Sequence, residues 1–187
     1  MNAILELDKK LLLLINKNHT PWADKLMWFV SERLNKIPLQ IIVFSVLYFV
    51  FRKRSPRLLI SLIILMMLLS ELVVLIAKNK VKRKRPFVND KKIRIINDYK
   101  LKDASFYSAH AANAFVPVVL VASIVKNRFI KLFLYCAGLV VGYSRIYLGQ
   151  HYPTDVLVGV IAGTIFGKLG ALIYKLIMLC KQVVIKL

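Results

Sequence analysis

The stretch LLISLIILMMLLSELVVLIA, residues 58–77, sets the strongest limit on how this chain can fold. Twenty residues in a helix rise about 30 Å, the thickness of the hydrocarbon core of a bilayer. Glu71 is the only ionisable residue in the stretch. Such a segment is typical of a transmembrane helix, because a helix satisfies its backbone hydrogen bonds within one segment. We therefore expect an integral membrane protein.

Other apolar segments repeat this pattern along the chain, which is 58% hydrophobic. They cover residues 37–51, 111–125, 132–148 and 156–180. At 187 residues the chain has the length of one domain. The sequence therefore predicts an all-α integral membrane helical bundle, with about five transmembrane helices in a single membrane-embedded domain over residues 1–187.

The N-terminal region, residues 1–36, has a different character. Its stretch ILELDKKLLLLINKNH has an apolar core too short to cross a bilayer, and it contains Glu6, Asp8, Lys9 and Lys10. This pattern favours an amphipathic helix that lies in the membrane interface. Acidic residues precede the apolar run and no small-residue cleavage site follows it, so we expect the segment to be retained rather than removed as a signal peptide.

A basic insertion follows the second apolar segment. Residues 78–105 hold eleven Lys or Arg and three Asp, in a chain whose net charge is +20. Such a charge implies an anionic partner, which could be lipid headgroups, nucleic acid or a substrate phosphate. We expect no nucleic acid, because no recognisable nucleic-acid fold accompanies the insertion and its flanks enter the bilayer. Membrane lipids and a substrate phosphate both remain open as partners.

The charge bias leaves the membrane orientation undecided. The segments RKRSPR and KNRFIK, with Lys175, Lys181 and Lys186, carry ten Lys or Arg on one side of the membrane. The basic insertion alone carries eleven on the other side. The positive-inside rule is therefore close to a tie.

Five spans would place the basic insertion and residues 149–153 on the same membrane face. That parity brings polar residues of three separate segments to one end of the bundle: Lys78, Arg85, Ser108, His110, Arg145, His151 and Asp155. We predict that residues 78–108 form a polar active-site loop at this end.

These residue types suit phosphate chemistry. Arginine presents a planar fork that matches phosphate oxygens, and Lys78 adds positive charge. His151 and Asp155 are spaced i, i+4, so the carboxylate can orient one ring nitrogen and leave the other as a nucleophile or base. His110 could exchange protons with the leaving oxygen and with water. A metal site is disfavoured, because no further carboxylate accompanies these residues and several cations would repel a metal ion.

Three motifs in this region resemble the type 2 phosphatidic acid phosphatase family of membrane lipid phosphatases. Lys78, six residues and then Arg85-Pro86 resemble its first motif, and the stretch SFYSAHAANAF resembles the second, usually Pro-Ser-Gly-His. Ser144-Arg145, five residues, His151, three residues and Asp155 match the third. The motifs occur in order at the expected spacing, from Lys78 to Asp155.

The resemblance implies a mechanism without metal or cofactor. His151 would attack phosphorus and form a phosphohistidine, Asp155 would orient it, and His110 would protonate the leaving oxygen and then activate water. The phosphate oxygens would be held by a set of side chains and one backbone amide: Lys78, Arg85, Ser108, Arg145 and the amide of Ala109.

The resemblance also implies a substrate class and a location. The substrate would be a lipid phosphate monoester or diphosphate, with lipid A 1-phosphate, undecaprenyl diphosphate and phosphatidylglycerophosphate as candidates. The enzyme would be a multi-pass protein of the bacterial inner membrane, with its active site facing the periplasm or outer face. A phosphotransferase that uses the same intermediate, and a non-catalytic protein that binds anionic lipids, are the alternatives.

The sequence departs from the family motifs at two positions and has two further features outside them. Tyr107 and Ala109 stand where the family usually has Pro and Gly, and Ala tolerates positive φ poorly. Glu71 is either a functional group in the membrane or an interhelical polar contact. Residues 159, 163 and 167 form a GxxxGxxxG row that allows close helix packing, and we favour packing within a monomer over a homodimer.

Overall fold

The chain is a helical bundle with shorter helices at one end. A computed structural model describes residues 2–33, 37–52, 55–96 and 103–186, and these residues form helices and no strand. The elements are α1 (Asn2–Lys17), α2 (Pro21–Trp28), the π-helical turn η1 (Phe29–Arg33), α3 (Ile37–Val50), α4 (Pro56–Val81), α5 (Pro86–Asn89), α6 (Ala109–Ile124), α7 (Arg128–Tyr147) and α8 (Pro153–Lys186). The all-α helical bundle predicted from the sequence is confirmed.

The long helices match the apolar segments. In the part of the chain that the structure describes, three segments are long and apolar enough to cross a membrane: Pro56–Asn89, Arg128–Tyr147 and Pro153–Val183. Helix α6 is apolar but has 16 residues, which rise about 24 Å, and α3 has 14. The bundle is therefore membrane-spanning, while the number of five spans stays a prediction. Helix α4 continues to Val81, so Lys78 lies on its last turn rather than in a loop.

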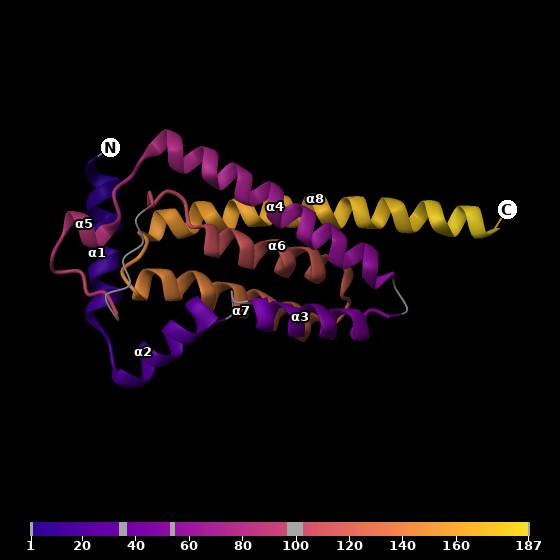
Figure 1. Cartoon of the computed structure of the whole chain (residues 1–187), viewed down its shortest axis with the longest axis horizontal. Helices are drawn as coiled ribbons and strands as arrows, with labels where there is room; N and C mark the ends of the chain where they lie inside the picture. The colour runs from indigo at the N-terminus through magenta and orange to yellow at the C-terminus, as the bar shows by residue number, and fades with distance from the viewer. Residues whose placement is uncertain (1, 34–36, 53–54, 97–102, 187) are drawn as a thin grey trace.

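Helix α6 occupies the centre of the bundle. Figure 1 shows it between α4, α7 and α8, and it contacts all three. Its buried side chains include Ala111, Ala112, Val116 and Val119, which are small or β-branched. Such side chains keep the helix axes close together, so the residues at the start of α6 are held firmly against α8.

The glycine row of α8 faces α6. A Cβ atom on Gly159 would lie 2.5 Å from the carbonyl oxygen of Ser108, and one on Gly163 would overlap the carbonyl oxygen of Ala112. At Gly167 the nearest atom would be the Cβ of Val119, at 2.7 Å. Backbone atoms of α6 therefore fill the space beside these glycines, and the row packs two helices of the same chain.

Helix α1 crosses the end of the bundle with a reversed pattern of burial. It contacts α7 and α8. Asp8, Leu12 and Asn16 are spaced by four residues and form its buried face. Four leucines of the helix are exposed, next to charged side chains: Leu5, Leu7, Leu11 and Leu14. Exposed leucines and buried polar groups fit a helix in the membrane interface, where the surroundings of the protein are partly apolar.

We predict that Gly163→Ala destabilises the bundle by about 1–3 kcal/mol, because the new methyl group meets the α6 backbone and cannot be accommodated by a side-chain rotation. The measurement is thermal unfolding in detergent. Gly170→Ala is the matched control, since its methyl group would meet the flexible side chains of Leu120 and Met66 rather than backbone, and the gain in helix propensity is the same. Equal unfolding temperatures for the two variants would contradict this account of the α6 and α8 packing.

Candidate active site

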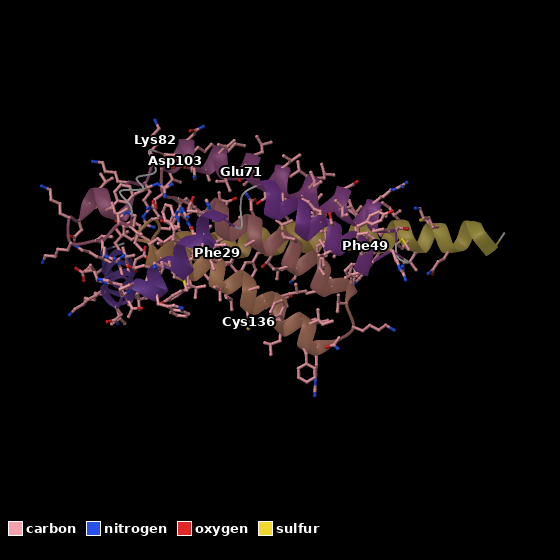
Figure 2. All side chains as sticks on the ribbon, turned by 60° about the horizontal axis from the view of Figure 1, so that its bottom comes forward. Phe29, Phe49, Glu71, Lys82, Asp103 and Cys136 are labelled. Atoms are coloured by element: carbon pink, nitrogen blue, oxygen red, sulfur yellow. The ribbon has the colours of Figure 1, made fainter. Side chains whose placement is uncertain are left out.

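The predicted site residues meet at one end of the bundle, where α4 ends and α6 and α8 begin. Many side-chain nitrogen atoms gather at this end in Figure 2, around the labelled Lys82 and Asp103. The segment from Arg83 to Ser105 and the turn before α8 bring further polar groups to it. The fold thus joins three parts of the chain that are far apart in sequence.

Asp155, in the first turn of α8, is the most heavily bonded of the site residues. Its Oδ1 accepts a hydrogen bond from Arg83 Nη1 at 2.7 Å. Its Oδ2 accepts from Ser105 Oγ at 2.5 Å and from the backbone N–H of Tyr152 at 3.0 Å. Its backbone carbonyl accepts from the N–H of Ser108 at 3.0 Å. Because Asp155 is fully buried, these bonds fix its orientation.

His151 lies between Asp155 and Arg85. Its Nδ1 is 3.8 Å from Asp155 Oδ2, which is beyond hydrogen-bond distance. Its Nε2 is 3.2 Å from Arg85 Nη1. An arginine can only donate, so Nε2 acts as the acceptor and the ring proton of the neutral imidazole is on Nδ1, facing the carboxylate.

The environment keeps His151 uncharged at neutral pH. Burial lowers the pKa of His151 to about 4. Asp155 raises this pKa and Arg145 lowers it further, so the two charges partly offset each other. A neutral ring with a lone pair on Nε2 is the form that a nucleophile requires.

Arg85 and Lys78 share one carboxylate. Arg85 Nη2 donates to Asp103 Oδ1 at 2.7 Å, and Lys78 Nζ donates to the other oxygen of the same group. Burial would raise the pKa of Asp103, but these hydrogen bonds outweigh burial and lower it to about 2. Asp103 is 48% exposed, so a carboxylate open to solvent lies between the two cations.

The start of α6 adds backbone donors. Ser108 is buried and caps the helix, with its Oγ accepting from the N–H of Ala111 at 3.4 Å. Ala109 is the first helical residue, so this position does not require the left-handed conformation that favours glycine. His110 follows and lies within electrostatic range of His151. The N–H groups of the first turn are suited to bind an anion.

Arg145 has a partner that the sequence did not indicate. Its guanidinium is fully buried, and Nη1 donates to Glu32 Oε1 at 2.9 Å and also to Ser31 Oγ, both in η1. Its backbone carbonyl accepts the N–H groups of Gln150 and His151, at 3.1 and 3.2 Å. Arg145 is therefore near the histidines, as predicted, and it also positions the turn that carries His151.

Sequence reasoning missed Arg83 and Asp8. Besides Asp155, Arg83 binds Asp8 through Nη2 at 2.6 Å, and its guanidinium lies 3.9 Å above the ring of Tyr152. Asp8 also accepts the backbone N–H of Thr154 at 2.9 Å. Arg83 stands in a basic run for which the sequence left both lipid headgroups and a substrate phosphate open as partners. The signal for Asp8 was its i, i+4, i+8 spacing with Leu12 and Asn16, which marks one face of α1.

Two cavities adjoin these residues. One of about 510 Å³ is lined mainly by cations of the loop and the end of α4, with Asp103 among them. Another of about 400 Å³ lies between α3, α4 and α6 and includes His110 and Glu71. Among the described residues no group of three His, Cys, Asp or Glu side chains is placed to hold a metal ion. The geometry is that of an anion site next to a largely apolar groove.

Comparisons with known proteins agree with this geometry. The model of the PAP2 superfamily matches residues 58–178, which include the proposed site residues from Lys78 to Asp155. A lipid A 4'-phosphatase of Bacteroides thetaiotaomicron is 26% identical over 166 residues, which cover 84% of this chain and 72% of the relative.

Solved structures share the fold. The crystal structure of Aquifex aeolicus LpxE superposes with a TM-score of 0.73 at 28% identity, over 86% of this chain and 92% of that one. A transmembrane PAP2 type phosphatidylglycerolphosphate phosphatase from Bacillus subtilis gives a TM-score of 0.73 at 23% identity, over 91% and 85% of the two chains.

The family match covers well over half of the chain, and the named relatives are phosphatases. The resemblance read from the three motifs is confirmed. The chain belongs to the PAP2 superfamily and is a multi-pass membrane lipid phosphatase of that type.

Proposed function

We propose that the enzyme removes phosphate from a lipid phosphate monoester or diphosphate through a phosphohistidine on Nε2 of His151. One observation carries this proposal. Nε2 faces the guanidinium of Arg85, while the opposite ring nitrogen faces Asp155. A phosphate bound by Arg85 would therefore sit against the lone pair of an oriented imidazole.

In the first step Nε2 of His151 attacks phosphorus, and the bond between phosphorus and the lipid oxygen breaks. The leaving oxygen takes a proton from His110, which lies at the start of α6 on the side of the apolar groove. The imidazole of His151 becomes cationic as it forms the P–N bond, and Asp155 stabilises that charge. The products of this step are the lipid alcohol, or the lipid monophosphate from a diphosphate, and the phosphoenzyme.

In the second step water attacks phosphorus and the P–N bond breaks. His110 accepts the proton of the attacking water, which returns both histidines to their starting forms. Inorganic phosphate then leaves toward the cavity lined by cations. The step consumes one water and needs no oxidant or reductant.

The phosphate oxygens would be held by the side chains of Lys78, Arg85, Arg145 and Ser108 and by the backbone N–H of Ala109. Phosphoryl transfer depends mainly on positioning and on stabilising the charge of the equatorial oxygens. Cationic side chains and helix N–H groups supply both. We therefore expect turnover without an added metal ion or cofactor.

The proposal extends to substrate, organisation and location. A relative named lipid A 4'-phosphatase supports a lipid A phosphate as substrate, and undecaprenyl diphosphate and phosphatidylglycerophosphate are the other candidates. Residues 1–187 would act as one domain and as a monomer, since the glycine row packs within the chain. The enzyme would lie in a bacterial inner membrane with α1 and the site at the periplasmic face.

We predict that His151→Asn lowers phosphate release from these lipids by at least about 10³-fold, because it removes the nucleophile. The assay uses purified protein in EDTA, with wild type as reference and gel filtration to compare folding. Wild-type turnover by the variant, or a strict need of the wild type for added divalent metal, would contradict the mechanism.

We predict that Asp103→Asn lowers KM for the lipid substrate several-fold, because the Asp103 carboxylate occupies the cations that a phosphate would bind. Inhibition by inorganic phosphate should strengthen in parallel. Asp90→Asn is the matched control, because this substitution removes the same charge outside the cluster. Asp90 pairs with Lys9 at 2.8 Å. An equal change in both variants would show a general charge effect instead of competition at the site.

We predict that Asp8→Ala lowers kcat by about tenfold and changes KM by less than twofold. Without Asp8, Arg83 loses one of the bonds that fix its position against Asp155, whereas the phosphate-binding side chains keep their contacts. Steady-state kinetics on one lipid substrate provide the measurement. Glu6→Ala, an exposed acid on the same helix, is the control and should behave as wild type. A rise in KM with unchanged kcat would overturn the positioning role.

A further inference from the structure

A groove on the membrane side of the site has apolar walls and a polar end. Phe44, Ile64 and Leu68 belong to the walls, and Glu71, His110 and Asn113 to the polar end. The groove lies between α3, α4 and α6 and has a volume of about 400 Å³. Figure 2 shows Glu71 further along the bundle from Asp103 and Lys82. An amphiphile fits such a groove with its tail along the walls and its headgroup at the polar end.

The polar end adjoins the leaving-group side of the reaction centre. Glu71 and Lys78 are seven residues apart on α4, so they share one face and are separated by about 10 Å along the helix. Asn113 is one turn after His110 on α6 and faces the same groove. A phosphate at Lys78 and Arg85 would thus leave the space between His110 and Glu71 for the first unit of the leaving alcohol.

Hydrogen-bond acceptors dominate this polar end. Asn113 Nδ2 donates to Glu71 Oε2 at 2.9 Å. Asn113 Oδ1 is buried and has no hydrogen-bond partner in the described chain. A carboxylate and an amide oxygen bind groups that donate hydrogen bonds, such as hydroxyl or amide N–H groups. A polyprenyl diphosphate would place its second phosphate here, whose ionised oxygens accept hydrogen bonds, and its chain has no donor, so both oxygens would stay without a donor.

Tyr107 is a further polar group close to Glu71, outside the lining of the groove. It stands where the family usually has Pro, and its side chain is 4% exposed. Its hydroxyl has no hydrogen-bond partner among the residues that the structure describes. Burial and the charge of Glu71 raise the pKa of Tyr107, so the hydroxyl stays protonated. Tyr107, the residue that departs from the family motif, therefore lies within electrostatic range of Glu71.

We propose that Glu71 and Asn113 form a subsite for the headgroup of the leaving alcohol, which selects lipid phosphates whose phosphorylated unit carries hydroxyl or amide N–H groups. Sugar lipids and glycerol lipids share this chemistry, and polyprenyl phosphates lack it. The inference rests on the proposed lipid phosphatase function and adds the class of lipid to it. If the hydrogen bond between Asn113 and Glu71 only joined α4 to α6, its loss would affect all lipid substrates alike.

The test compares three substrates with the purified enzyme in detergent: lipid A, phosphatidylglycerophosphate and undecaprenyl diphosphate. We measure kcat/KM from phosphate release for wild type, Glu71→Leu and Asn113→Leu. Both variants should lose about ten- to hundredfold with lipid A or phosphatidylglycerophosphate, whichever the wild type prefers, and less than threefold with undecaprenyl diphosphate. The preferred substrate distinguishes a sugar headgroup from a glycerol headgroup.

Leu68→Ala is the matched control, because Leu68 is one turn from Glu71 and lines the apolar wall. Leu68→Ala should lower kcat/KM for all three substrates by similar factors. Thermal unfolding separates folding from binding, and Glu71→Leu should not lower the unfolding temperature, since it removes a costly carboxylate from a membrane helix.

Two results would contradict the inference but leave the proposed function intact. One is an equal loss of activity on all three substrates in Glu71→Leu and Asn113→Leu. The other is a wild type that turns over only undecaprenyl diphosphate. Absence of phosphate release from every lipid would instead count against the proposed function.

Discussion

Three hydrogen bonds to the carboxylate of Asp155 hold the site together. They come from Arg83 after α4, from Ser105 before α6 and from the backbone of Tyr152 before α8. A buried carboxylate is costly unless it is paired and fully bonded, so each of these contacts is needed in the folded state. The same contacts join segments that come together only in the complete bundle. The carboxylate of Asp155 therefore links the segment after α4, the segment before α6 and the turn that carries His151.

The cations of the site are paired with carboxylates before any substrate binds. Lys78 and Arg85 share Asp103, and Arg145 is paired with Glu32. In the free enzyme these carboxylates offset part of the repulsion between the positive side chains. The two carboxylates differ in exposure, because Asp103 is 48% exposed and Glu32 is 15% exposed. In the proposed mechanism an incoming phosphate would replace Asp103 with little rearrangement, while Arg145 would stay fixed from within the protein.

The sequence predicted the parts of the site that follow from spacing. Lys78, Arg85, His151 and Asp155 come together as expected, because helix parity alone decides which ends of the apolar segments share a membrane face. Their proposed roles remain to be tested. The location of Lys78 on a helical turn differs from the expected loop, since α4 continues past the apolar stretch into polar residues.

Other contacts could not be predicted, for physical reasons. Six Lys or Arg lie between residues 78 and 85, and composition does not tell which of them points inward. Arg83 is inward because Asp8 of α1 meets it from the other side, a contact between residues 75 positions apart. The same limit applies to Glu32 and Arg145. For Glu71 the sequence left open a functional group in the membrane or an interhelical polar contact. The hydrogen bond from Asn113 supports the interhelical contact. The groove that Glu71 lines supports a role in binding.

The contacts of α1 have a practical consequence for work with this enzyme. Figure 1 shows the two ends of the chain in different surroundings, with α1 against the site end of the bundle and the last turns of α8 extending beyond the other helices. An affinity tag or fusion partner placed before Asn2 would be attached to α1. This helix carries Asp8, which contacts the proposed active site through Arg83. A tag after α8 would lie at the far end of the molecule. Recombinant protein intended for kinetics should therefore carry its purification handle at the C-terminus.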